Sequence, residues 1–132
     1  MTFSLKSTTS WALLVLILMQ FTPLKRINPP TVSVIQAPDN VKIALKKSCY
    51  DCHSNETRWP ALAWIAPASW LASGIVTSGR NALNFSTWNN KKRAKIRKTL
   101  SEGSAHQQLY YLLRPEKQLT ATETGTILQW LK

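Results

Sequence analysis

Apolar and polar residues alternate along this chain mostly with the period of a helix. The pattern is clear from residue 40 to residue 47, where apolar residues are interspersed with three lysines. Asp39, just before this stretch, is a suitable N-cap. Thr120 and Glu123 have capping-box spacing before a last apolar run. No segment shows useful β alternation, so the sequence predicts an all-α fold. Its helices are expected over residues 40–47, 67–83, 91–100, 106–113 and from 121 onward.

The N-terminal stretch is apolar over a length that suggests a membrane. Residues 7–24 carry no charge, and residues 11–19 are continuously apolar. Eighteen residues of helix extend about 27 Å, near the lower limit for crossing a bilayer. No small-residue cleavage site follows. We therefore expect a membrane-anchor helix within residues 1–24, a Pro-containing tether over 25–38, and one domain over 39–132.

The strongest chemical signal is Cys49-Tyr50-Asp51-Cys52-His53, a C-x-x-C-H sequence typical of c-type haem attachment. Two thiols at this spacing can each bond one vinyl group of the porphyrin, and the histidine can ligate the iron. A redox dithiol, a disulfide and a zinc site are alternatives. Redox dithiols of this spacing usually occur in a βαβ context, which the all-α pattern does not supply. A structural zinc site needs about four ligands, whereas the chain has only two cysteines and two histidines, and these are not at zinc-finger spacing. We expect one covalent haem c, with its iron, at Cys49, Cys52 and His53.

Charge adds a candidate partner. The net charge is +11, and six of the eight residues from Lys91 to Lys98 are basic. Such a helix suits an acidic redox partner or anionic lipid, and it can equally be a solvated face. Nucleic acid is not expected, because the haem signal and the apolar N-terminus both point outside the cytoplasm. No small-molecule substrate is predicted.

Several further runs accompany the C-x-x-C-H sequence, at residues 26–30, 49–60, 65–67, 69–70, 79–80, 83–88, 115–116, 119–120 and 130–131. Together these runs resemble the small haem-binding domain family of bacterial membrane-anchored monohaem c-type cytochromes. The resemblance implies a fold like the class I cytochromes c, in which the first and last helices pack together near the haem. It also implies a single-pass anchor in the bacterial inner membrane, with the haem domain facing the periplasm.

One departure from that family concerns the iron. Its members usually carry Met-Pro-Pro before the last helix, with the methionine as sixth ligand. Here those positions hold Ala105, His106 and Gln107, and the only methionines are Met1 and Met19. Either His106 replaces the methionine, or the sixth position is open, with a lysine as a minor third option. An open position would leave His106, Gln107, Tyr110 and Tyr111 as candidate distal donors.

The expected function is one-electron transfer by a monohaem cytochrome, not enzymatic catalysis. The alternative is a haem-based ligand sensor or a peroxidase-like protein with an open sixth position. A third class is an accessory domain that only binds haem. No phosphate loop or nucleophile–base set is evident in the sequence.

Overall fold

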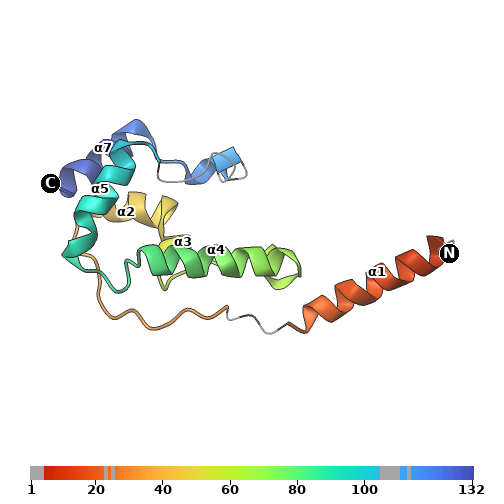
Figure 1. Ribbon diagram of the computed structural model, residues 1–132. Coiled ribbons are helices and arrows are strands. Elements are labelled where there is room, and N and C mark those ends of the chain that lie inside the picture. Colours follow the sequence, from red (N-terminus) through yellow and green to blue (C-terminus); the bar gives the residue numbers. More distant parts are fainter. Residues whose placement is uncertain (1–4, 23, 25, 105–110, 113) are drawn as a thin grey trace.

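The computed structural model describes residues 5–22, 24, 26–104, 111–112 and 114–132, and Figure 1 shows their arrangement. Within these residues the regular structure is helical, with one isolated bridge between Ser33 and Thr87. The all-α class is therefore confirmed. The elements are α1 (Leu5–Gln20), α2 (Asp39–Ser48), α3 (Tyr50–His53), η1 (Ala61–Trp64), α4 (Ala68–Ala82), η2 (Asn90–Lys92), α5 (Arg93–Ser101), η3 (Pro115–Lys117) and α7 (Ala121–Trp130).

Helix α1 corrects the predicted membrane anchor. It has 16 residues, about 24 Å of helix, against a hydrocarbon core of about 30 Å. It ends at Gln20, whose side chain donates to Leu16 O (2.9 Å) and accepts from Ala66 N (3.0 Å). Among the described helices, none combines the length and apolar character needed to span a bilayer. The predicted anchor helix and the single-pass inner-membrane location derived from it are therefore wrong.

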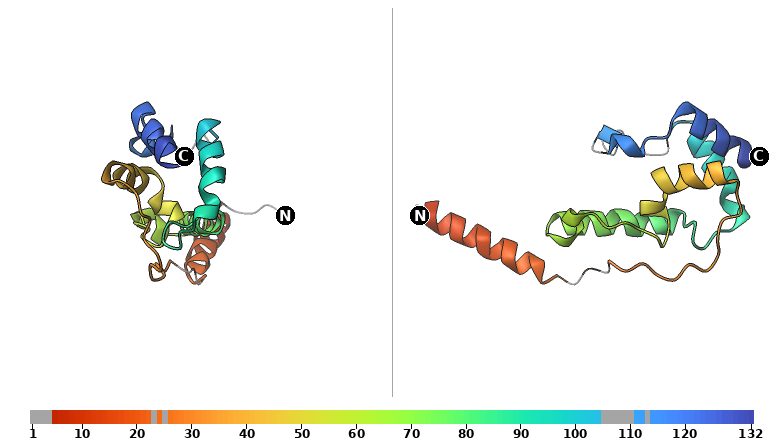
Figure 2. Two further views of the ribbon diagram at one scale, coloured as in Figure 1. Left: turned by 90° about the vertical axis from the view of Figure 1, so that its left-hand side faces the viewer. Right: turned by 180° about the vertical axis from the view of Figure 1, so that it is seen from behind.

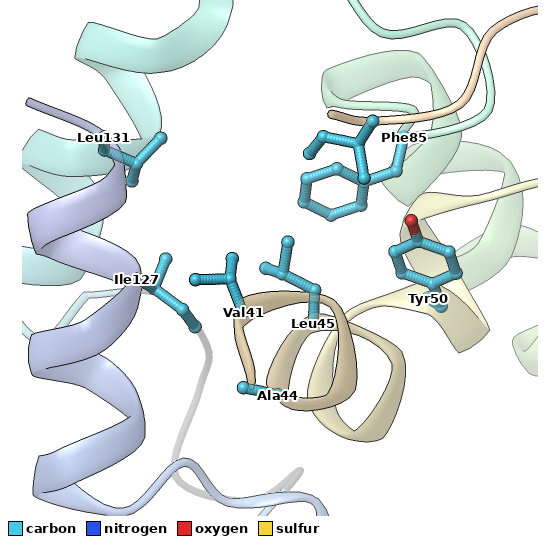
Figure 3. Packing of buried hydrophobic residues seen from close by; sticks show 8 residues of the cluster. Val41, Ala44, Leu45, Tyr50, Phe85, Ile127 and Leu131 are labelled. Atoms are coloured by element: carbon cyan, nitrogen blue, oxygen red, sulfur yellow. The ribbon is translucent and has the colours of Figure 1, made fainter. Parts of the chain in front are cut away.

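The core forms where α2 meets α7, the first and last helices of the domain (Figure 3). Val41, Ala44 and Leu45 lie on one face of α2, at the spacing of an amphipathic helix. They pack in one cluster with Ile127 and Leu131 near the C-terminus. The packing of first and last helices that the resemblance implied is thus present.

A polar link supports the same helix pair. Thr120 caps α7: its backbone N–H donates to Glu123 Oε2 (2.8 Å), and Glu123 N donates to Thr120 Oγ1 (3.2 Å). Lys47 of α2 donates to Glu123 Oε2 at 2.6 Å. The Lys47 ammonium and the Thr120 backbone N–H both favour the charged carboxylate, so they hold the pKa of Glu123 below its usual range. The predicted capping box is confirmed, and it also connects α7 to α2.

A row of aromatic rings connects α3 to α7. Tyr50 stacks on Phe85 (centroids 5.3 Å apart), Phe85 stacks on Trp88 (5.7 Å), and Trp88 lies tilted against Trp130 (5.7 Å). The Arg93 guanidinium covers the Trp130 ring at 4.8 Å from its centroid. Offset rings at these distances attract one another beyond their buried area. The row therefore connects the C-x-x-C-H segment to the C-terminal helix.

The residues before α2 run extended along the helical domain (Figures 1 and 2). Both Val32 N and Ser33 N donate to Ser86 O, at 2.9 and 3.0 Å. Ile35 is 1% exposed and belongs to the core cluster. This extended segment, residues 26–38, is therefore in contact with the same loop that carries Phe85.

Candidate functional site

The C-x-x-C-H residues lie at the junction of α2 and α3. Cys49 follows the last residue of α2, and its N–H still makes a helical hydrogen bond to the residue four positions earlier, Leu45 O (2.8 Å). A single turn of helix follows, closed by His53 N donating to Cys49 O (2.9 Å). Residues three and four apart share a helix face, so this turn keeps Cys52 and His53 close in space to Cys49. The two cysteines are free thiols, not a disulfide.

An apolar cavity of about 220 Å³ opens beside this turn. Cys49 and His53 line it, whereas Cys52 lines a neighbouring recess of about 140 Å³. The walls come from α2, the end of α4, the loop after it, and α5. The other lining residues are Leu45, Ala82, Leu83, Phe85, Lys92, Lys95, Ile96, Thr99 and Leu100.

The ring of His53 is oriented by two backbone carbonyls. Its Nδ1 lies 2.8 Å from Gly79 O and 3.2 Å from Leu83 O. Carbonyl oxygens only accept hydrogen bonds, so Nδ1 carries the ring proton and donates. In this tautomer Nε2 carries the lone pair that a metal ion requires. His53 therefore has the orienting bonds expected of a metal-ligating histidine.

Gly79 permits α4 to approach α3 this closely. A Cβ added at Gly79 would lie 2.4 Å from Cys52 O and 3.0 Å from Cys52 C, both backbone atoms. No side chain fits at such a contact, because the backbone of α3 would have to move. The missing side chain thus allows Gly79 O to reach the His53 ring.

Arg80, the next residue, joins the extended segment to the loop after His53. Its Nε donates to Ser54 O (2.8 Å), and its Nη2 donates to Asn28 Oδ1 (2.8 Å) and Thr57 Oγ1 (2.9 Å). Its Nη1 donates to Ile27 O (2.9 Å). The guanidinium thus binds four oxygens and no carboxylate. Its role here is structural.

Asn55 completes the same network from the other side. Its backbone N donates to Ser86 Oγ (2.9 Å), its Nδ2 donates to Pro30 O (2.8 Å), and its Oδ1 accepts from Asn84 Nδ2 (2.8 Å). Phe85 N donates to the carbonyl of His53 itself (2.7 Å). Runs that are far apart in sequence, at 26–30, 49–60, 79–80 and 83–88, therefore meet in one hydrogen-bond network around the C-x-x-C-H turn.

The electrostatics of the two thiols disfavour a redox dithiol. Burial raises the pKa of the Cys49 thiol to about 12, with a smaller contribution from Cys52. Burial and the Asp51 carboxylate raise the pKa of Cys52, which Lys117 and Arg80 oppose. Dithiol catalysts depend on a lowered thiol pKa, because the thiolate is the nucleophile. In the described part of the chain, no group of three or more residues could serve as ligands for a zinc ion.

Comparison with known proteins identifies the family. A family model described as a haem-binding domain matches residues 14–132. The chain belongs to this haem-binding domain family. No curated protein and no solved structure gives a match.

The described residues fit the cofactor of a haem-binding domain. The cavity is mainly apolar, as a porphyrin face requires, and His53 is oriented for ligation by its bonds to neutral carbonyls. Cys49 lies in the same cavity, and Cys52 is half-buried one helical turn away. The predicted residues Cys49 and His53 thus meet in the cavity, whereas Cys52 lies in the neighbouring recess.

Of the residues predicted to lie on the other side of the iron, only Tyr111 belongs to the described part of the chain. His106 lies outside the described residues, as do Gln107 and Tyr110. Tyr111 is half-buried, and its pKa is raised by burial with a contribution from Cys49. The η1 segment does not line the cavity, and its Trp64 is 58% exposed.

Sequence reasoning missed the α5 wall and the carbonyls that orient His53. The wall residues recur at helical spacing from residue 92 to residue 100, and this spacing could have predicted a helix face that lines a cavity. The many basic residues of this segment made that face hard to recognise. For the contact between Gly79 O and the His53 ring, the sequence offered only the presence of a glycine within a predicted helix.

Gly79→Ala is expected to unfold or loosen the site. The added methyl collides with the Cys52 backbone, which we expect to cost about 1–3 kcal/mol of unfolding free energy. Gly74→Ala is the matched control in the same helix, because nothing lies within 4 Å of its added Cβ. It should stabilise the protein by up to about 1 kcal/mol. Chemical denaturation measures both, and equal effects of the two variants would contradict the close contact.

Proposed function

We propose that this haem-binding domain holds one haem c covalently through Cys49 and Cys52, with His53 as the axial iron ligand, and that it transfers single electrons. The observation that carries the proposal is the His53 ring, whose Nδ1 donates to Gly79 O and Leu83 O. Each thiol would add across one vinyl group, with a C–S bond formed at one vinyl carbon and the thiol proton passed to the other. The addition is redox-neutral, so no oxidant or reductant is required.

The hydrogen-bond partners of His53 support a carrier over a peroxidase-like protein. A carboxylate acceptor raises the basicity of a ligating imidazole, whereas the acceptors here are neutral carbonyls. Strong electron donation from an axial ligand favours O–O cleavage. A moderately basic His53 therefore suits reversible change between ferrous and ferric iron.

The outer side of α5 supports an acidic redox partner. A shallow basic groove there is lined by Asn90, Lys91, Arg93, Ala94, Arg97, Lys98, Ser101, Leu131 and Lys132. Among the described residues, no carboxylate pairs with Lys91 or Arg97, and Lys98 meets Glu102 only at 3.9 Å. None of these groove residues lines the cavity beside His53. A partner in the groove would be separated from the haem cavity by about one helix diameter, roughly 10 Å.

Covalent attachment predicts that haem stays with the protein under denaturing conditions. The protein, produced with a haem-attachment system, should retain haem stain on a denaturing gel. Cys49→Ala and Cys52→Ala should each keep one thioether and shift the pyridine haemochrome band to longer wavelength. The double variant should lose the stain. Ser48→Ala is the control, since its buried hydroxyl has no hydrogen-bond partner in the described structure. Full extraction of haem from the unmodified protein would contradict covalent binding.

Electron transfer predicts six-coordinate, low-spin iron. The reduced protein should show a sharp α band that CO does not change, and His106→Ala should allow CO to bind if His106 is the sixth ligand. Gln107→Ala is the neighbouring control. Uptake of CO by the unmodified protein would instead favour the ligand-sensor or peroxidase-like alternative.

The basic groove predicts charge-selective electron exchange. Oxidation of the reduced protein by anionic hexacyanoferrate(III) should slow severalfold as ionic strength rises, because salt screens the attraction. The double variant Lys91→Gln/Arg97→Gln should slow it at low salt. Lys42→Gln/Arg58→Gln changes the net charge equally but lies outside the groove, so its effect should be smaller. Equal slowing by both double variants would show that only net charge matters.

A further inference from the structure

The cavity beside His53 has two lysines in an otherwise apolar wall. Ile96 and Leu100 of α5 face it, opposite residues from α2 and from the loop after α4. Lys92, the last residue of η2, and Lys95, an exposed residue in the first turn of α5, line the same cavity. No aspartate or glutamate lines it within the described chain. The cavity therefore combines apolar walls with positive charge that the protein does not neutralise there.

The two lysines differ from the other basic residues of this helix. Lys91, Arg97 and Lys98 lie along the outer groove, and none of them lines the cavity. Lys92 is half-buried, and its Nζ donates to Ala82 O (3.0 Å), a carbonyl in the last turn of α4. Lys95 has no carboxylate partner among the described residues. Both ammonium groups thus have donor capacity beyond the contacts they make.

A haem matches this distribution of charge. Its ring is a flat apolar surface, and its two propionates are the anionic groups at one edge. Thioether bonds at Cys49 and Cys52 would engage the vinyl groups, which leaves the propionates as the remaining polar substituents. We propose that Lys92 and Lys95 bind the two haem propionates. This inference rests on the proposed function only in placing the haem in this cavity.

Such pairing would have two consequences. Each ammonium favours the charged propionate, as an opposite charge at a few ångströms lowers a carboxyl pKa by about 1–3 units. An ion pair also neutralises part of the propionate charge, which otherwise stabilises ferric iron. Removing either lysine should therefore raise a propionate pKa and lower the reduction potential.

The test is a titration of the propionates themselves. Haem with ¹³C-labelled propionate carboxyls is incorporated into the full chain, and the carboxyl shifts are followed by NMR against pH. Lys92→Gln and Lys95→Gln should each raise one propionate pKa by about 1 unit, roughly tenfold in proton affinity. Lys95→Arg retains the charge and should leave the titration near that of the unmodified protein. Lys98→Gln removes one positive charge from the outer side of α5, and it should also leave the propionate titration near that of the unmodified protein.

Three results separate this inference from the proposed function. Identical titrations in Lys92→Gln, Lys95→Gln and Lys98→Gln would overturn the pairing. Loss of the low-spin bands in Lys95→Gln or Lys92→Gln would show that a lysine binds iron, which also overturns it. If haem proves to be bound without thioethers, covalent attachment fails while the titration on that complex still decides the role of the lysines.

Discussion

The site depends on the backbone contact between α3 and α4, at Gly79 and Cys52. A Cβ at Gly79 would lie 2.4 Å from Cys52 O, so the helices can approach this closely only because no side chain intervenes. The same approach brings Gly79 O to 2.8 Å from His53 Nδ1. Position, tautomer and ring orientation of His53 thus follow from one steric condition. A metal ligand is most effective when such outer contacts determine its orientation.

The rest of the domain keeps that contact in place. Arg80, adjacent to Gly79, binds oxygens of the extended segment and of the loop after His53. Asn55 binds the loop that carries Phe85, and Phe85 begins the aromatic contacts that lead to α7. A buried polar network of this kind is stabilising when its members are satisfied. Its members are spread over four separated runs of sequence, and these are among the runs on which the resemblance to a haem-binding domain family rests.

The sequence was informative where the chemistry is local. The Thr120–Glu123 capping box depends on residues three apart, and the C-x-x-C-H spacing determines which groups share one helical turn. The apolar N-terminus misled the prediction, because hydropathy alone did not reveal that the Gln20 side chain bonds to Leu16 and Ala66 where the helix ends. The partner of Gly79 was not predictable, because it lies 27 positions away in the chain, at Cys52. Contacts of this kind depend on tertiary packing and leave no local pattern.

The basic segment from Lys91 to Ser101 faces two different surroundings. The composition of this segment shows only that it is strongly basic, and a helix exposed to solvent on all sides could have the same composition. Packing divides the segment: residues 92, 95, 96, 99 and 100 line the cavity, and residues 93, 94, 97, 98 and 101 line the outer groove. If the cavity holds a haem, charge toward the cavity would act at short range on its propionates, whereas charge toward solvent would act through a screened field on an approaching partner. Two lysines of equal charge, Lys95 and Lys98, should therefore differ in what they control: Lys95 the ionisation of the haem edge, and Lys98 the rate of encounter.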